Sequence, residues 1–142
     1  MSARAVTRVL LHPAIAAALP RLAASALPAE ACALLTGRVD GGALVLDGLA
    51  PSRNLAAAPD AAFEIDTALQ LRLQRATRAV AAVWHSHPRG PAAPSARDAD
   101  GAWDDRLAWL ITAGAVTTAW LPLGAGRGFS PLPLDFGSLS PA

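Results

Sequence analysis

The sequence of 142 residues contains no lysine, no tyrosine and only one cysteine. Because Cys32 has no second cysteine to pair with, an internal disulfide and a cysteine-pair zinc motif are both excluded. Cysteine usage of this kind is typical of a reducing compartment, so we expect a cytoplasmic location. The absence of lysine leaves all twelve basic side chains as arginines.

Charged residues are also scarce, at 16% of the chain against a usual share of about 25%. Hydrophobic residues reach 53%, which excludes a disordered chain and predicts a folded globular protein. The formal net charge is only +1, so the charge balance does not favour binding to nucleic acid, and we expect no nucleic-acid partner. The length fits one domain, which we predict to span residues 1–142.

Two apolar stretches raise the question of a membrane. The first 25 residues begin with arginines and then turn apolar, as a signal peptide would, but His12, Pro13 and Pro20 interrupt the run and favour a short amphipathic helix. Leu107–Gly126 carries no charge and is just long enough to span a bilayer. Because glycine, threonine and proline interrupt this stretch, we predict two buried strands joined by a tight turn, and no membrane association.

The periodicity of apolar residues predicts an alternation of helices and strands. The first half of the chain is expected to form a helix over Pro13–Ser25, two strands over 30–39 and 43–50 joined by a turn at 40–42, and a loop over 51–60. A helix capped by Asp66 and carrying Leu69, Leu73, Ala76 and Val80 should follow, and then a strand over 79–85. The remainder is expected to form an irregular loop over 88–94, a helix from Ser95 to about Ala108, and two or three closing strands. This order predicts an α/β fold in which helices pack on a mixed β-sheet.

The stretch from Val83 to Asp98, VWHSHPRGPAAPSARD, concentrates residues that can bind a metal ion. His85 and His87 are two apart, so in a strand they share one face at a backbone separation of roughly 7 Å and can converge on one ion. Ser86 points the other way. Pro88 ends the strand, and ligand sites in α/β sheets are usually found at strand ends.

Ser95 and Asp98 follow at a helix start, where residues three apart lie on one face. Asp98 can then supply a third ligand beside the two histidines, and two histidines with one carboxylate and an open position are typical of catalytic zinc. An alternative without chemistry is a helix cap beside two packed histidines. The combination of four residue types at these offsets is expected by chance in fewer than about one in a thousand chains of this length.

Hydrolysis at such a site needs a proton acceptor, and the chain has two glutamates, Glu30 and Glu64. Spacing alone does not choose between them. Ser95 is suited to donate a hydrogen bond to a developing oxyanion. A zinc deaminase is disfavoured, because its H-x-E and C-x-x-C motifs are absent from this sequence.

The segment HSHPRGPAAPSARD resembles the signature of the JAMM, or MPN-plus, zinc metalloproteases, which is H-x-H, seven residues, S-x-x-D and an upstream glutamate. LPAEACALLTG, SRNLAAAPDAAFEID and LAWLITAG are similar to further parts of bacterial members, so the resemblance covers roughly residues 30–123. It implies that His85, His87 and Asp98 bind Zn²⁺, that Glu30 is the general base and acid, and that Ser95 assists the oxyanion. Glu64 would then be a surface or cap residue.

The resemblance also implies a fold, a substrate and a partner. The fold is a cytidine-deaminase-like α/β sandwich, the JAB/MPN fold. The most similar branch consists of small bacterial enzymes linked to ubiquitin-like sulfur-carrier proteins, and these enzymes cleave the peptide or isopeptide-type bond after the carrier's Gly-Gly tail, for example in a carrier–cysteine adduct. A non-catalytic binding domain and a zinc peptidase with an unrelated substrate remain alternatives, and a homodimer is considered as well. Ala33 departs from the pattern, because bacterial members usually carry glycine there.

Overall fold

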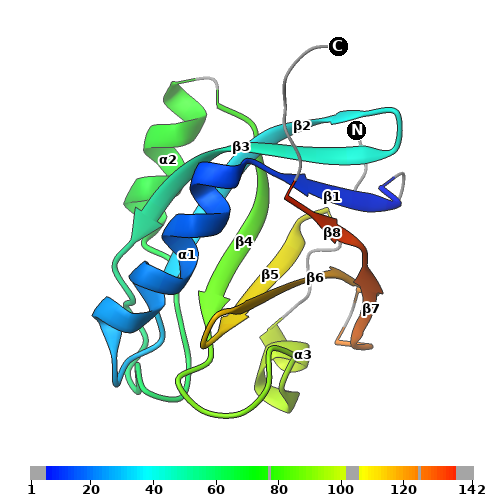
Figure 1. The fold of residues 1–142 in the computed structure, drawn as a ribbon. Helices are drawn as coiled ribbons and strands as arrows, with labels where there is room; N and C mark the ends of the chain where they lie inside the picture. The colour runs from blue at the N-terminus through cyan, green and yellow to red at the C-terminus, as the bar shows by residue number, and fades with distance from the viewer. Residues whose placement is uncertain (1–5, 77, 102–105, 125, 137–142) are drawn as a thin grey trace.

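The computed structural model describes residues 6–76, 78–101, 106–124 and 126–136, whose strands form one eight-stranded sheet (Figure 1). The strands are β1 (Arg8–Leu11), β2 (Cys32–Asp40), β3 (Ala43–Ser52), β4 (Val80–Ser86), β5 (Ala108–Ala113), β6 (Val116–Pro122), β7 (Phe129–Leu132) and β8 (Leu134–Asp135). Their order in the sheet is β7-β6-β5-β4-β2-β3-β1-β8. β4 pairs antiparallel with β2 and parallel with β5, so the sheet is mixed, as predicted.

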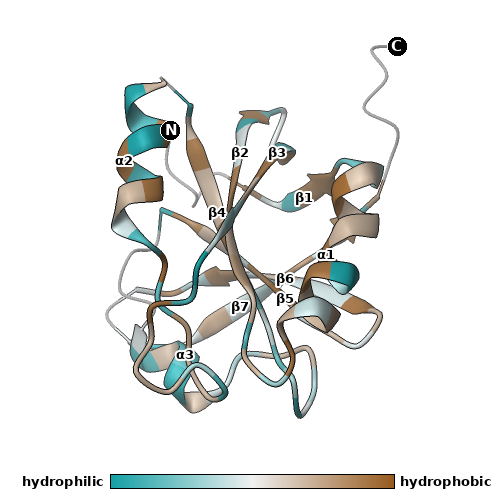
Figure 2. Ribbon diagram, turned by 90° about the vertical axis from the view of Figure 1, so that its left-hand side faces the viewer, coloured by the Kyte–Doolittle hydropathy of each residue, from teal (hydrophilic) through white to brown (hydrophobic). Residues whose placement is uncertain are grey.

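Helices cover both faces of this sheet. They are α1 (Pro13–Ala26), α2 (Thr67–Arg75) and α3 (Ala96–Gly101), and Figure 2 shows α1 and α2 on opposite sides of the sheet. α1 buries Ile15, Leu19 and Ala23, which are four residues apart and therefore lie on one face of the helix. The predicted amphipathic helix and the sandwich of helices around a mixed sheet are both confirmed.

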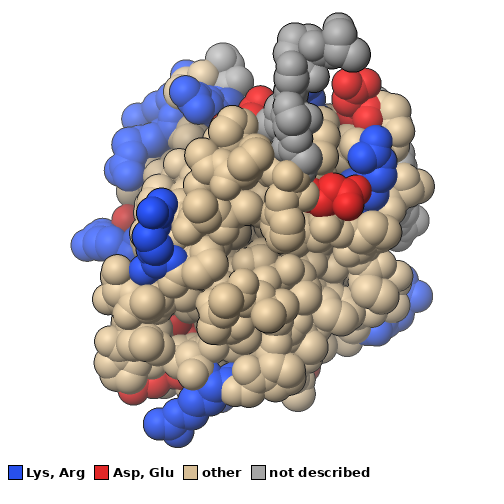
Figure 3. Space-filling view, viewed as in Figure 1, with Lys and Arg blue, Asp and Glu red and all other residues tan. Residues whose placement is uncertain are grey.

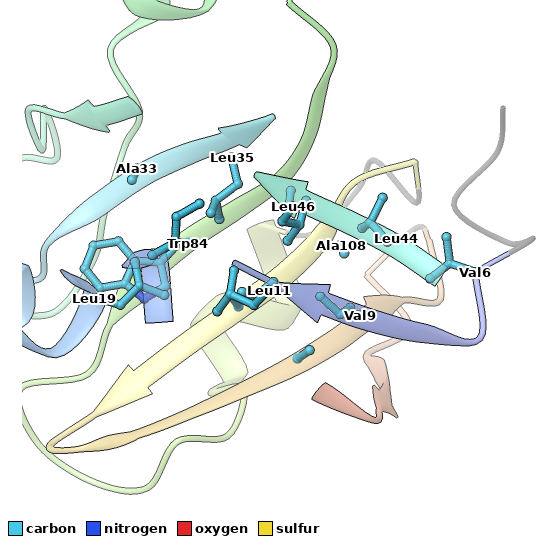
Figure 4. Close-up of a cluster of buried hydrophobic side chains, with 14 of the residues drawn as sticks. Val6, Val9, Leu11, Leu19, Ala33, Leu35, Leu44, Leu46, Trp84 and Ala108 are labelled. Carbon is cyan, nitrogen blue, oxygen red and sulfur yellow. The ribbon is translucent and has the colours of Figure 1, made fainter. Parts of the chain in front are cut away.

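The larger core lies between α1 and the sheet (Figure 4). Its fully buried members include Leu11, Leu19, Leu35 and Trp84, and the Trp84 indole N–H donates to Thr112 Oγ1 over 2.8 Å. This hydrogen bond satisfies the one polar atom of the ring, so the largest side chain of the core is buried without a polar penalty.

A smaller core lies on the opposite face, beneath α2. It joins Leu34, Leu69, Val83 and Trp109. Because side chains along a strand alternate between faces, Val83 and Trp84 of β4 belong to different cores. His85 therefore points to the same face as Val83, the α2 face, and this places the histidine motif there.

Charge is spread thinly over the outside of the molecule. Figure 3 shows charged side chains around a broad uncharged area on the face that carries α1. Ion pairs between exposed residues, such as Arg38 with Asp47 at 3.3 Å, lie at the surface. Among the carboxylates that the structure describes, only Glu30 and Asp98 are buried. These two belong to segments that the sequence predicted to be functional.

Several element boundaries were predicted wrongly. α2 ends at Arg75 and is followed by a hydrogen bond from the Arg78 N–H to Leu73 O. Val80, which was expected in this helix, instead begins β4, because it pairs with Thr36 of β2. The helix from Ser95 ends at Gly101 in the described residues. Residues 102–105 lie outside them, and Ala108 belongs to β5.

The strands at the two ends of the chain were under-predicted. β1 was not expected, because its four residues precede the helix within one apolar run, and only parallel pairing with β3 and β8 makes them a strand. The described residues include four closing strands, β5 to β8, where two or three were expected. β5 and β6 are joined at Gly114, whose φ of +59° favours glycine, so the predicted pair of strands with a tight turn is confirmed. β5 is buried as predicted, whereas most of β6 is only half-buried. No helix in the described ranges is long and apolar enough to cross a membrane.

Candidate metal centre

The end of β4 presents two histidines on the α2 face. His85 is completely buried, and His87 follows the last strand residue, where its N–H donates to Thr112 O over 2.9 Å. Between them, Ser86 Oγ accepts from the Ala31 N–H over 2.8 Å, so this side chain is used to tie β4 to the segment before β2. The two imidazoles are thereby left side by side, with ring centroids 4.9 Å apart.

Asp98 comes from α3, which lies beyond the carboxyl end of β4 in Figure 1. Ser95 and Asp98 form a reciprocal cap, in which Ser95 Oγ accepts from the Asp98 N–H over 3.1 Å and the Ser95 N–H donates to Asp98 Oδ2 over 2.9 Å. Ser95 and Asp98 therefore do form the helix cap that the alternative without chemistry predicted, and this cap is compatible with metal binding by Asp98. The cap fixes the carboxylate so that it faces the two histidines.

Three side chains converge on one point. His85 Nε2 lies 3.1 Å from His87 Nε2 and 3.1 Å from Asp98 Oδ1, while His87 Nε2 lies 3.0 Å from Asp98 Oδ2. In a tetrahedral zinc site with bonds of about 2.0–2.1 Å, ligand atoms are about 3.3–3.4 Å apart, so these separations are close to those of a zinc site. His85, His87 and Asp98 can therefore hold one metal ion.

The second nitrogen of each imidazole is held differently. His87 Nδ1 lies 2.9 Å from Pro91 O, and donation to this carbonyl leaves Nε2 with a lone pair for a metal. His85 Nδ1 has no hydrogen-bond partner within the described parts of the chain. Its ring instead stacks on Phe63, with centroids 4.4 Å apart and planes 14° apart, and forms a T-shaped pair with Trp109, with centroids 5.4 Å apart. Aromatic contact therefore orients His85 where a hydrogen bond orients His87.

The charges at this point suit a cation. Burial lowers the pKa of His85, which favours its neutral, metal-binding form. Burial alone would raise the pKa of Asp98, but hydrogen bonds from His85 and His87 hold it well below its usual range, so the carboxylate is ionised. The hydrogen bond with Asp98 raises the pKa of His87. A bound cation would replace the shared proton between these groups.

Glu30 lies just before β2 and is 7% exposed. No described residue gives a hydrogen-bond partner to its Oε1 atom. Burial raises the pKa of Glu30 to about 7, and the negative charge of Asp98 adds to this, while His87 and Arg97 oppose it. A carboxyl group that titrates near neutrality can both accept and return a proton.

Glu30 and Ser95 open onto one cavity with His87. This cavity of about 410 Å³ is completed by Pro28, Asp60, Ala61, Pro88 and Arg89. Glu64 is exposed and lines a separate apolar cavity of about 350 Å³ beside Asp98. The Ser95 hydroxyl oxygen accepts from the Asp98 N–H, and no acceptor for its own proton lies among the described residues, so this proton can be donated into the first cavity. The geometry therefore favours Glu30 over Glu64 as the proton acceptor.

Cys32 pairs with His85 across β2 and β4, yet its thiol is not among the ligand atoms that converge at the site. Burial raises the pKa of the Cys32 thiol to about 11, and the thiol is directed at the carbonyls of Ser52 and Arg53. Ala33 is fully buried in the α1-side core, opposite Trp84 on β4. The methyl group that departs from the glycine pattern therefore points away from the metal-binding face.

Two residues near the site were missed in the sequence. Phe63 stacks on His85, and Asn54 makes hydrogen bonds around Glu30, yet both lie in a segment that gives no periodic signal. The signal that could have identified Phe63 was the presence of an aromatic residue in an otherwise irregular segment. Trp109 lies in the α2-side core, and its ring also contacts His85.

Comparisons with known proteins give one family match and several solved structures with a similar fold. The sequence model described as prokaryotic homologs of the JAB domain matches residues 12–122. The solution structure of a Desulfitobacterium hafniense protein is similar, with 30% identity, a TM-score of 0.75, and coverage of 89% of this chain and 90% of that chain. A Salinibacter ruber protein is 23% identical, with a TM-score of 0.69 over 92% of each chain. A JAB1/MPN domain protein from Archaeoglobus fulgidus is 20% identical, with a TM-score of 0.57 over 90% of this chain and 97% of that chain. No curated protein matches the sequence.

Proposed function

Because this chain belongs to the prokaryotic homologs of the JAB domain, we propose that it is a zinc-dependent peptidase, with His85, His87 and Asp98 as the zinc ligands. The observation that carries the proposal is the convergence of these three side chains beside a buried carboxyl group, Glu30, whose pKa is raised to about 7. Family members can be metallopeptidases, and a site without catalysis would not need a proton acceptor in the same cavity.

Each residue has a distinct part in the proposed reaction. Zinc, when bound, supplies a Lewis acid that activates water and polarises a carbonyl oxygen. Glu30 takes the proton of the attacking water at Oε1, which has no hydrogen-bond partner among the described residues, and returns it to the departing amine. Ser95 donates its hydroxyl proton to the developing oxyanion, while its oxygen keeps the cap on Asp98. Pro91 O holds His87 in the orientation in which its Nε2 faces Asp98.

The proposed substrate is a ubiquitin-like sulfur-carrier protein extended beyond its Gly-Gly tail. The resemblance of the whole segment 30–123 to bacterial JAMM enzymes supports this choice. The cavity that joins Glu30, His87 and Ser95 also supports it, because its volume of about 410 Å³ is large enough to receive a two-residue tail beside the proposed proton acceptor. The bond after the second glycine would lie beside Glu30.

The metal proposal is tested by zinc content, measured by mass spectrometry on protein purified without chelator. We expect one zinc per wild-type chain, none in His87→Ala, and one in His12→Ala. His12 is the matched control, because it is the third histidine of the chain and its Nδ1 accepts from the Ala14 N–H at the start of α1. A zinc-free wild type, even after zinc is added back, would favour the non-catalytic binding domain.

The substrate proposal is tested with a sulfur-carrier protein that has one to four residues after Gly-Gly. The zinc-loaded wild type should release the extension and leave the carrier ending in Gly-Gly, while the His87→Ala variant should not. A carrier in which Gly-Gly is replaced by Val-Val is the control and should remain intact. Failure of the zinc-loaded enzyme to cleave any extended carrier would refute the substrate and leave the zinc site standing.

A further inference from the structure

The loop between β3 and α2 touches both halves of the site. Its residue Phe63 stacks on the ring of His85, and its residues Asp60 and Ala61 line the cavity that contains Glu30. The loop has little regular structure of its own, apart from one isolated bridge between Asn54 and Ile65. Some other interaction must therefore fix its shape against the site.

Asn54 supplies that interaction through both ends of its side chain. Its Oδ1 accepts from the Ala56 N–H and from the Glu64 N–H, each over 3.0 Å. Its amide group donates to Ala62 O over 2.9 Å, so the side chain binds the residues on both sides of Phe63. A half-buried asparagine thereby closes the loop upon itself and sets the position of the aromatic ring.

The same amide group reaches across to the segment before β2. It donates to Glu30 O over 3.0 Å, while the Glu30 N–H donates to Pro59 O over 2.8 Å. Both backbone groups of Glu30 are therefore bound to the loop or to the residue that organises it. Among the residues that the structure describes, none bonds to Oε1 of the Glu30 carboxyl group, so its placement depends on this backbone anchoring.

We propose that Asn54 is a positioning residue that couples the placement of Glu30 to the orientation of His85 through the 54–64 loop. It does not touch the reacting atoms; it acts through the Glu30 backbone on one side and through Phe63 on the other. The roles of Glu30 and His85 rest on the proposed function, whereas the coupling itself is a property of the folded chain.

The test compares Asn54→Ala with Ser52→Ala in the full chain. Ser52 is the matched control, because its Oγ accepts from the Asp66 N–H over 2.9 Å at the far end of the same segment without touching Glu30. The first readout is zinc affinity, measured by chelator competition. Asn54→Ala should weaken it about 10–100-fold, the usual cost of losing support behind a metal ligand, and Ser52→Ala should not.

The second readout is the titration of Glu30 in zinc-free protein, followed by carbon NMR of labelled glutamate. The chain has only two glutamates, Glu30 and Glu64, so the signals are separable. Asn54→Ala should lower the pKa of Glu30 from about 7 toward its ordinary value, because a loosened loop admits water. The charged groups that act on Glu30, which are Asp98, His87 and Arg97, are unchanged by this substitution.

The two readouts separate this proposal from the zinc proposal. If Asn54→Ala and Ser52→Ala behave alike in both, the positioning role is overturned and the zinc site is untouched. If the wild type binds no zinc, the proposed function fails, and the coupling is judged by the Glu30 titration alone. Should Asn54→Ala not fold, Asn54→Ser replaces it, because its hydroxyl can accept from the Ala56 N–H but is too short to donate to Glu30 O.

Discussion

The two faces of β4 serve different purposes. On the α1 side, Trp84 is fully buried in an apolar core that includes Leu11, Leu19 and Leu35. On the α2 side, one residue further along, His85 is buried just as completely, yet its Nδ1 has no hydrogen-bond partner in the described ranges. On the first face the one polar atom of Trp84 is hydrogen-bonded to Thr112, whereas on the second face a buried ring nitrogen of His85 is left unpaired among the described residues.

The contrast extends to the ionisable groups. Among the described residues, no ionisable side chain is buried in the α1-side core, whereas Glu30 and Asp98 are buried near His85 and His87. Burying a carboxylate costs free energy unless a partner compensates, so a fold retains such groups chiefly where they act. The α1 face therefore contributes mainly to the free energy of unfolding, whereas the α2 face buries ionisable groups at a cost in that free energy.

The largest effect is expected on catalysis, from Glu30→Gln. The cleavage rate of an extended carrier should fall by about 10²–10⁴-fold, because the amide cannot accept the proton of the attacking water. Zinc content should stay at one per chain, which separates loss of the base from loss of the metal. Glu64→Gln is the matched control and should keep the wild-type rate; an equal loss there would assign the proton acceptor to the other glutamate.

On the opposite face, Trp84→Ala should cost about 3–5 kcal/mol in the free energy of unfolding, the usual cost of such a cavity. Urea denaturation measures this loss. Trp120→Ala, which removes a half-buried tryptophan on the α2 side, should cost less. Equal losses would show that the two faces contribute similarly to stability and would remove the contrast between them.

Zinc should stabilise the α2 face by linkage. At a free zinc concentration 100 times its dissociation constant, the free energy of unfolding should rise by about 2.7 kcal/mol. Thermal unfolding with and without zinc measures the change. Asp98→Ala should abolish it, and Asp100→Ala, an exposed residue on the same helix, should retain it. A rise that survives in Asp98→Ala would place the ion elsewhere.

The smallest effect concerns pH. The folded protein raises the pKa of Glu30 from 4.5 to about 7, so it holds this proton more tightly than the unfolded chain, and stability is lost as pH rises from about 4.5 to 7. In zinc-free protein at pH 8, Glu30→Gln should therefore increase the free energy of unfolding by about 1–2 kcal/mol, after allowance for water in the cavity. The two proteins should be nearly equal at pH 4. A difference that does not change with pH would argue against a raised pKa.

Much of the fold was readable from local patterns. The helix over Pro13–Ser25, the hairpin at 40–42 and the buried strand before His85 follow from apolar periodicity and turn residues, and the predicted JAB/MPN fold is confirmed by the family match and structural neighbours. β1 and β8 were not readable in this way. Each is a short segment whose strand character comes from pairing with residues distant in the sequence.

The sequence by itself determined the family and the residues available to bind a metal ion. In H-x-H and S-x-x-D, strand and helix geometry places these residues on one face over a few positions. Tertiary structure decided what these groups face. It buried Glu30 beside His87 while leaving Glu64 exposed, stacked Phe63 on His85, and connected the two through Asn54. The burial of Glu30 and its pKa depend on contacts between segments that are distant in the sequence and come together only in the folded sheet. No local sequence pattern predicts these contacts.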